Sequence, residues 1–302
     1  MGHHRGVIEA PEARPTVADL RDGADVDAVF ACARKDRLTA RSGSTYLALE
    51  LRDRTGSIPG RAFRDADFLA GQFDRGDLVH VAGRVERFRE ELQIEVKSIR
   101  RAQAEIDPAA FLPMAYRDLE ELDGFLEHFA REVHDTDYRR LLDAMLADDP
   151  FREALRRAPC SRGGHHAYLG GLLEHTVAVA TLAVEACALH PRLNSDVLVT
   201  AALLHDIGKV REFHYSAEIA LSDEGALVGH TALGLDLISE WIGRVGAFPP
   251  EKKLALSHCV LGHHGPDALP GRRFRSAEAM ALHRLNAVDA AIKGALEQGL
   301  PK

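Results

Sequence analysis

Two periodicities divide this chain of 302 residues. From about residue 24 to 102, apolar and polar side chains alternate with a period of two, which is the pattern of half-buried β-strands. The clearest alternating stretches are STYLALELRD, DLVHVAGRVERF and LQIEVKSI, and turn signals such as RSGS, DRTGS and FDRGD separate them. About five short strands in about 80 residues indicate a small closed or nearly closed barrel.

From residue 111 onward the period becomes helical. Apolar residues recur at spacings of three and four in the first such segment, at Leu119, Leu122, Leu126, Phe129 and Val133. Further helical segments are predicted at about 137–147, 170–190, 195–207, 226–244, 251–262 and 276–298. No strand-like alternation returns, so the second part is predicted to be all-α. We therefore expect a flexible N-terminal tail (1–20), a barrel domain (21–102) and a helical domain (103–302) whose first part, 103–160, holds a linker and leading helices.

Composition narrows the class of protein. The N-terminal stretch MGHHRGVIEAPEARP lacks the apolar core of a signal peptide, and no apolar run approaches the roughly 20 residues that span a bilayer, so no membrane partner is expected. The four cysteines form no CxxC pair, which favours neither a zinc ribbon nor a disulfide framework and fits the reduced cytoplasm. A net charge of −8 argues against indiscriminate nucleic-acid binding, although residues 24–102 hold 15 Lys/Arg against 13 Asp/Glu.

Histidines gather in the helical part, where 11 of the 16 lie from residue 165 onward. In NSDVLVTAALLHDIGKV, Asn194 or Ser195 can cap a helix that Gly208 can end. His205 falls on the apolar face of that helix, and Asp206 follows it directly. A buried carboxylate without a partner costs several kcal/mol, and a divalent metal would supply the missing positive charge.

Asp289 shows the same feature, because it shares a helical stripe with Leu282 and Leu285. A solvated position at the helix edge is the alternative for this residue. Four more histidines lie in comparable apolar or helix-end settings, namely His175, His230, His263 and His264. A single such histidine is usually a satisfied core residue, whereas this many together with two misplaced carboxylates indicate a metal site.

The order of these residues resembles the HD superfamily of metal-dependent phosphohydrolases. More narrowly, HHAYLGGLLEHT, LLHDIGKV, LVGH, LSHCVLGHHG and AEAMALHRLNAVDA resemble, in order and spacing, the YhaM-type 3′-to-5′ exoribonucleases. Proteins of that family carry an OB-fold nucleic-acid domain before the HD domain. The resemblance covers about residues 24 to 295 and implies an all-β OB-fold barrel followed by an all-α HD domain. The stretch PDALPGRRFRS departs from the family pattern, which usually shows an aromatic-containing Gly-Ser-Pro stretch at this place.

The resemblance also implies roles for individual residues. His175, His205, Asp206 and Asp289 would hold one metal ion, and Asp206 would bridge to a second ion completed by His230, His263 and His264. The family implies manganese, and a donor set rich in imidazole suits Mn, Fe, Co, Ni or Zn better than Mg or Ca. Lys209 would approach phosphate oxygens, or it is a cation favoured at a helix C-terminus. His166, beside His165, would contact substrate or protonate the leaving oxygen, or it is a capping or core histidine.

Single-stranded RNA or DNA is the expected partner of the barrel, since OB-type barrels stack bases on aromatic rings and follow phosphates with cations. The candidate contacts are Tyr46, Arg84, Phe88 and Lys97 on the strands, and Arg272 and Arg273 in the departing loop, with Phe274 available for stacking. A solvated surface is the alternative for each. The predicted function is a metal-dependent 3′-to-5′ exoribonuclease. The alternatives are a phosphohydrolase of small nucleotides and a non-catalytic single-strand-binding protein.

Overall fold

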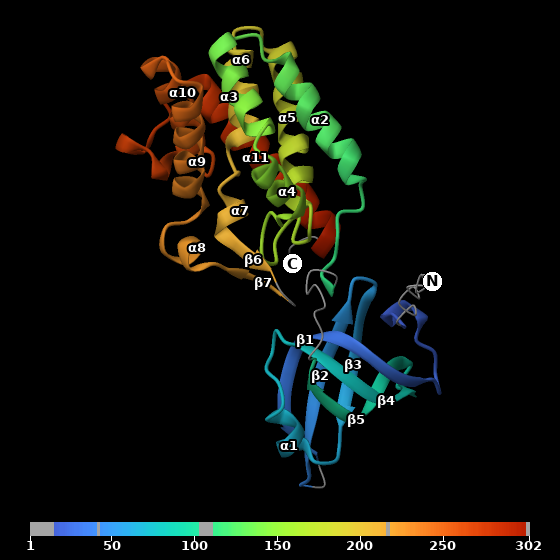
Figure 1. Ribbon diagram of the computed structural model, residues 1–302. Helices are drawn as coiled ribbons and strands as arrows, with labels where there is room; N and C mark the ends of the chain where they lie inside the picture. Colours follow the sequence, from blue (N-terminus) through green and yellow to red (C-terminus); the bar gives the residue numbers. More distant parts are fainter. Residues whose placement is uncertain (1–14, 41–42, 103–110, 216–217, 300–302) are drawn as a thin grey trace, which may run out of the picture. The chain divides into compact units, whose positions relative to one another are not determined.

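The computed structural model describes residues 15–40, 43–102, 111–215 and 218–299 (Figure 1). The chain forms two compact units, and the main division falls between Leu112 and Pro113. Each unit has its own hydrophobic core, one formed by the N-terminal strands and one by the helices that follow.

The first unit is a closed five-stranded barrel with the strand order β1-β2-β3-β5-β4. Its strands are β1 (Asp25–Thr39), β2 (Thr45–Asp53), β3 (Gly56–Ala62), β4 (Leu78–Phe88) and β5 (Glu91–Arg101). The long β1 pairs with β4 through its first half and with β2 through its second, and β3 pairs with β5 in parallel to close the barrel. The five predicted strands and the OB-like barrel are confirmed.

The period-two pattern gives the barrel its core. Leu47, Leu49 and Leu51 of β2 are buried, as predicted, and so are Val79, Val81 and Val85 of β4. The short helix α1 (Ala66–Ala70) adds Ala66 and Leu69 to the same core.

The barrel begins before the predicted boundary at residue 21. Residues Val17–Asp19 form a 3-10 helix, and the backbone N–H of Val17 donates to Asp53 Oδ2 over 2.7 Å. Leu20 is buried in the barrel core. These residues therefore belong to the barrel, whereas residues 1–14 of the predicted tail lie outside the described part of the chain.

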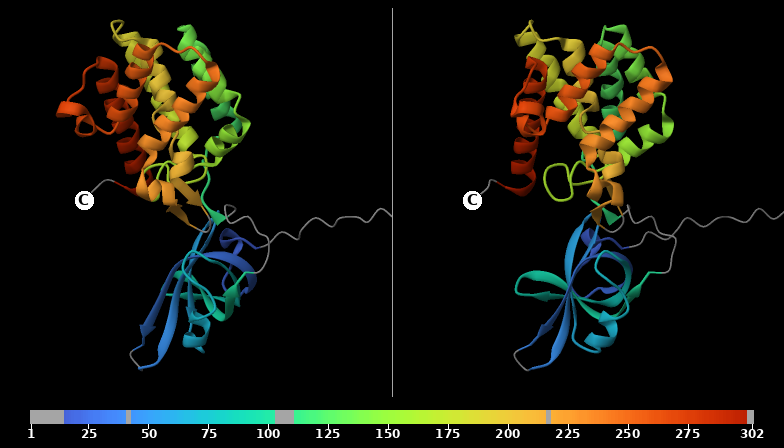
Figure 2. Two further views of the ribbon diagram at one scale, coloured as in Figure 1. Left: turned by 60° about the vertical axis from the view of Figure 1, so that its left-hand side comes forward. Right: turned by 90° about the vertical axis from the view of Figure 1, so that its left-hand side faces the viewer.

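The second unit is helical (Figure 1). Its helices are α2 (Leu119–Glu132), α3 (Thr136–Leu146), α4 (Asp149–Arg157), α5 (Gly171–Leu189), α6 (Ser195–Leu204), α7 (Lys209–Glu212), α8 (Asp223–Leu227), α9 (His230–Val245), α10 (Pro250–Gly262) and α11 (Ala277–Gln298). Figure 2 shows α11, coloured red, along one side of this unit. The predicted helical domain is confirmed, with corrections to its elements.

Three details differ from the sequence prediction. The segment predicted at 226–244 is two helices, because the chain turns at Gly229, where φ is +77°. Helix α4 was not separated from the leading region, although Asp148 caps it by accepting from the N–H of Phe151. Strands do return, as the two-stranded hairpin β6 (Phe213–Tyr215) and β7 (Ile219–Leu221), which are too short to show a period.

Helix α5 is the central helix of this unit. It is long and apolar enough to cross a membrane by length and composition, with a mean hydropathy of 1.5. The sequence analysis expected no apolar run of such length. Half of that window is buried within the protein, and the helix packs against α2, α4, α6 and α11. Since it also carries Glu174 and His175 among its buried residues, we interpret α5 as a core helix that presents polar groups to the interior.

Gly83 yields a test of how the barrel closes. The register between β4 and β5 shifts between Ala82 and Gly83, and a Cβ atom on Gly83 would lie 2.3 Å from the carbonyl oxygen of Glu95. Gly83→Ala should therefore lower the free energy of unfolding of the barrel by about 1–3 kcal/mol in denaturant titrations. Gly71→Ala is the matched control, because its φ of −79° suits alanine and the nearest atom is 3.5 Å away. Equal stability of the two variants would contradict this account of the bulge.

Candidate metal centre

Ends of several helices bring the predicted ligands together. His175 lies in the first turns of α5, and His205 and Asp206 follow the last residue of α6. His230 is the first residue of α9, and His263 and His264 follow α10. Side chains as far apart in the chain as His175 and His264 thus meet within one helical unit. The exception is Asp289 on α11, whose place is described below.

Asp206 occupies the middle of this cluster, and only 1% of it is exposed. Its Oδ2 atom lies 3.4 Å from Nε2 of His175 and 3.5 Å from Nε2 of His205. Its Oδ1 atom lies 3.4 Å from Nε2 of His230 and 3.3 Å from Nε2 of His263. Each carboxylate oxygen therefore faces a different pair of imidazole nitrogens, which is the arrangement of a bridging carboxylate.

Hydrogen bonds on the far side of three rings fix which nitrogen is available to a metal. Nδ1 of His205 donates to the carbonyl of Ala202 over 2.8 Å, and Nδ1 of His263 donates to the carbonyl of Val260. Nδ1 of His230 donates to Oε1 of Glu212 over 2.9 Å. With the proton held on Nδ1, each Nε2 carries a lone pair toward Asp206, as metal-ligating histidines do.

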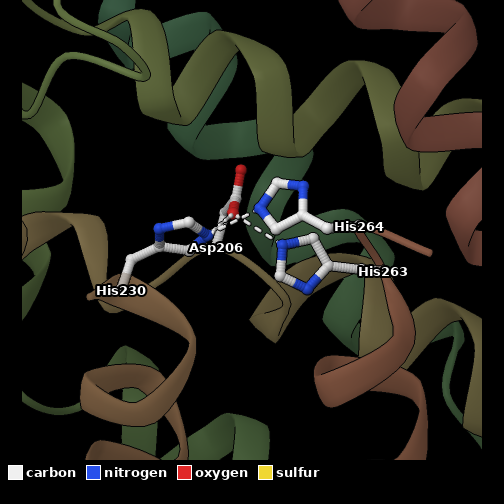
Figure 3. A group of neighbouring side chains, drawn as sticks. All are labelled: Asp206, His230, His263 and His264. Atoms are coloured by element: carbon white, nitrogen blue, oxygen red, sulfur yellow. Dashed lines mark hydrogen bonds and ion pairs between the residues drawn. The ribbon is translucent and has the colours of Figure 1, made fainter. Parts of the chain in front are cut away.

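Two buried atoms of the cluster lack hydrogen-bond partners. Among the described residues, Asp206 Oδ1 and His263 Nε2 are both inaccessible to solvent and unpaired. A buried polar atom left unsatisfied costs about 1–3 kcal/mol. Both atoms are acceptors, so a cation would satisfy them together. Figure 3 shows His230, His263 and His264 turned toward Asp206, and their ligand atoms lie within 4.8 Å of one another. The residues present therefore fit a divalent metal.

The protonation states agree with this interpretation. Burial acts to raise the pKa of Asp206, but Lys209 and His205 outweigh it, and the pKa stays well below the usual range. Burial lowers the pKa of His205, and burial together with His263 lowers the pKa of His264 to about 3. His175 differs, because Cys160, Asp206 and Asp289 outweigh its burial and raise its pKa to about 10, so a metal ion would have to displace its proton.

Gly208 allows α9 to reach the centre. The sequence analysis expected Gly208 to end the preceding helix, but α6 ends at Leu204, and Gly208 has an ordinary φ of −62°. What the position requires is space, because a Cβ atom there would lie 1.9 Å from the carbonyl oxygen of His230 and 2.5 Å from the backbone nitrogen of Gly234. The missing side chain thus lets His230 approach Asp206.

Asp289 lies behind His175 rather than beside Asp206. Its Oδ2 atom lies 2.6 Å from Nδ1 of His175 and 3.0 Å from Nε2 of His166. Hydrogen bonds from these two rings outweigh burial and lower the pKa of Asp289, so it is a charged acceptor. In this structure Asp289 turns Nε2 of His175 toward Asp206, a position from which a carboxylate orients a ligand. Asp289 also forms, with His166 and His175, a group of donors that could hold a metal ion, and its role as a direct ligand stays a prediction.

His166 is a buried part of the same network. Its Nδ1 lies 2.9 Å from the hydroxyl of Tyr168, which donates to Glu174, and its Nε2 faces Asp289. Both ring nitrogens thus have protein partners. The resemblance correctly placed His166 near the site, and its predicted role as a proton donor stays a prediction.

Lys209 was expected to approach phosphate oxygens or to be a cation favoured at a helix C-terminus, and in this structure its side chain contacts Asp206. Its ammonium donates to Asp206 Oδ2 over 2.6 Å and to Cys160 Sγ over 3.4 Å. Burial acts to lower the pKa of Lys209, but the charge of Asp206 outweighs it and the pKa lies above its usual value. The short helix α7 that begins at Lys209 turns the side chain back over the carboxylate.

Two residues that support the centre were missed or set aside. Nδ1 of His283 donates to the carbonyl of His263 over 3.0 Å, and Asn286 approaches the same oxygen at 3.4 Å. Only the spacing of His283 and Asn286 on the inner side of α11 could have indicated this. Nε2 of His258 accepts from the backbone N–H of Arg275 over 3.0 Å.

Most of the predicted nucleic-acid contacts are exposed. Arg84, Phe88, Lys97 and Arg273 all lie on the surface, and Arg84 stands in register with Asp25 and Glu95 on the neighbouring strands. Arg272 donates to Asp267 over 2.8 Å. Phe274 is not available for stacking on bases, because it packs into the helical core beside His283.

Tyr46 has an aromatic neighbour that the sequence analysis missed. Its ring centroid lies 5.5 Å from that of Phe63, which follows β3 and is 53% exposed. A groove of about 300 Å³ is lined by residues of β1, β2 and β3, and Arg34 and Arg61 are among them. OB-type barrels use this face for oligonucleotides.

Gly208→Ala tests the approach of α9. The added methyl group should displace His230 from Asp206 and reduce the bound manganese per chain, measured by elemental analysis after dialysis. Gly243→Ala in the same helix is the matched control, since a Cβ atom there meets nothing within 4 Å. If Gly208→Ala retained the manganese content of the control, the proposed role of this glycine would be wrong.

Comparisons with known proteins agree with this organisation. Residues 172–291 match the HD domain model, and residues 31–102 match the model of an OB-fold nucleic acid binding domain. The 3′-5′ exoribonuclease YhaM of Listeria monocytogenes serotype 4b (strain CLIP80459) is 25% identical over 277 residues, which cover 91% of this chain and 88% of the relative. The protein of the same name from Halalkalibacterium halodurans is 26% identical over 275 residues, covering 89% and 84%.

Among solved structures, the second OB-fold domain of replication protein A from Methanococcus maripaludis is 20% identical and covers 32% of this chain and all of that one, with a TM-score of 0.26. The two family models match in the order in which the structure shows a barrel and then a helical domain. The YhaM relatives match along nearly the whole chain. The chain therefore carries an OB-fold domain followed by an HD domain, and it is similar along nearly its whole length to relatives named 3′-5′ exoribonuclease YhaM.

Proposed function

We propose that the chain is a metal-dependent 3′-to-5′ exoribonuclease that hydrolyses the phosphodiester bonds of single-stranded RNA. The observation that carries this proposal is the carboxylate of Asp206, whose two oxygens face separate pairs of imidazole nitrogens. The similarity to relatives named 3′-5′ exoribonuclease supports the direction and the substrate.

The donors sort into two positions. His175, His205 and Oδ2 of Asp206 would hold one ion, while Oδ1 of Asp206 with His230, His263 and His264 would hold the other. We propose manganese at both. When bound there, two such cations would activate a water molecule and neutralise the attacking and leaving oxygens of a phosphodiester.

Neighbouring side chains orient these donors through hydrogen bonds. Asp289 and His166 hold the ring of His175, and Lys209 holds Oδ2 of Asp206. His264 is exposed whereas His175, His205 and His263 are buried. The scissile phosphate would therefore approach from the side of His264, where the centre is open.

The barrel would bind the single strand. Tyr46 and Phe63 offer adjoining aromatic faces beside a groove that contains arginines, which is the combination that binds single strands without strong sequence preference. Arg84, Phe88 and Lys97 remain proposed contacts on the other strands.

Asp206→Asn tests the centre. The amide keeps the size of the side chain but not its charge, so the rate on 5′-labelled single-stranded RNA with manganese should fall by at least about 100-fold. Helical content by circular dichroism should be retained. The control is Asp236→Asn, an exposed carboxylate on α9 that binds Arg211. Full activity of Asp206→Asn would remove this carboxylate from the mechanism.

The same assay on the unmodified chain separates the candidate functions. Stepwise shortening from the 3′ end supports the exoribonuclease. Cleavage of mononucleotide substrates alone would support the small-nucleotide phosphohydrolase, and tight binding without turnover under several metals would support the binding protein.

Phe63→Ala tests the barrel. Loss of one stacking face should weaken binding of a single-stranded RNA by about 1–3 kcal/mol in fluorescence anisotropy titrations. Phe68→Ala is the matched control, since Phe68 is 68% exposed in the same domain but belongs to helix α1. Equal losses in the two variants would show that this face does not bind the strand.

A further inference from the structure

Cys160 lies beside the metal centre without a role in the proposed reaction. It sits in the loop between α4 and α5 and is 1% exposed. Its Sγ atom lies 3.4 Å from Nζ of Lys209, 3.8 Å from Nε2 of His165 and 3.9 Å from Oδ2 of Asp206. The sequence analysis treated this residue only as one of four separate thiols.

The loop holds its cysteine and histidine together. The backbone N–H of Cys160 donates to the carbonyl of His166 over 3.1 Å. Ser161 Oγ donates to the carbonyl of His165 and accepts from the N–H of Gly164. These bonds fold the loop back on itself, so that the ring of His165 faces the sulfur.

A third metal-donor set results from this fold. Cys160 Sγ and one ring nitrogen each of His165 and His175 all lie within 4.8 Å of one another. Zinc bonds of 2.3 Å to sulfur and 2.0–2.1 Å to nitrogen in a tetrahedron place such donors about 3.6 Å apart. The observed 3.8 Å between Cys160 Sγ and His165 Nε2 is close to that value.

The surroundings already accept a positive charge at this point. The ammonium of Lys209 contacts both Asp206 Oδ2 and Cys160 Sγ. The carboxylate of Asp206, which is 1% exposed, also lies 3.9 Å from the sulfur, so the ammonium contacts both groups from one side. The site therefore combines a soft donor, two imidazoles and a nearby buried anion.

We propose that Cys160, His165 and His175 form a binding site for a soft divalent cation of the zinc class, next to the manganese centre. Thiolate ligands favour zinc over manganese, and zinc also stands above manganese in the general affinity order of divalent metals. Because His175 belongs to both donor sets, zinc at this site withdraws a ligand from the manganese centre and inhibits the enzyme. The inhibition rests on the proposed function, whereas the binding of zinc does not.

Cobalt(II) absorption tests the binding directly. Cobalt bound to a thiolate gives a sulfur-to-metal charge-transfer band in the near ultraviolet, which cobalt bound only to histidine and carboxylate does not. The full-length chain titrated with cobalt should show this band, and Cys160→Ser should lack it. Cys187→Ser is the matched control, a half-buried cysteine on α5 that should keep the band.

Zinc titration of the manganese-supported activity tests the consequence. With each variant normalised to its own rate without zinc, the zinc concentration that halves activity should rise at least 10-fold in Cys160→Ser and stay unchanged in Cys187→Ser. If Cys160→Ser fails to fold, His165→Gln should keep the charge-transfer band and weaken zinc binding in equilibrium dialysis by at least 10-fold.

Several outcomes would overturn the proposal. They are an undiminished band in Cys160→Ser, the absence of a band in the unmodified chain when cobalt is bound, and unchanged zinc affinity in His165→Gln. A chain that shows the Cys160-dependent band but no exonuclease activity with manganese would refute the proposed function alone. Normal exonuclease activity without the band would refute this inference alone.

Discussion

A charged carboxylate held out of water governs the arrangement of the helical domain. Asp206 is 1% exposed, and its charge is stabilised by the ammonium of Lys209 and by the imidazoles around it. Burying an isolated ionised carboxylate would cost more free energy than the net stability of a folded domain. The termini of α5, α6, α9 and α10 therefore converge on one point because each brings a group that interacts with this charge.

Much of this could be predicted from the sequence, for a physical reason. Burial imposes its period on apolar residues, so the alternation around Leu49 indicated a strand, and the spacing from Leu119 to Val133 indicated a helix. Polar residues that interrupt an apolar face stand out in the same way, which is how His205 and Asp206 were recognised. The resemblance to the YhaM-type family added the assignment of His230, His263 and His264 to a second metal ion, although their helices meet only in the folded chain.

What could not be predicted depends on rotamers and on contacts between distant segments. Helical periodicity gives the direction of a Cβ atom but not the path of a long side chain, so Lys209 was expected outside the helix end and instead folds back onto Asp206. Asp289 was expected at the metal, and its hydrogen bond to His175 was not predicted. The role of Gly208 depends on its close approach to His230, and the role of Phe63 depends on its contact with Tyr46. No local sequence pattern predicts either contact.

The hydrogen bonds of His205 and His263 to carbonyls three residues earlier carry a consequence for how the site assembles. Each bond joins a ring to the backbone of its own helix end, so it can form as soon as that helix does. The rings are then aimed before the segments meet, and little side-chain entropy is left to lose at that step. Docking of α9 over Gly208 remains the long-range event that completes the centre during folding.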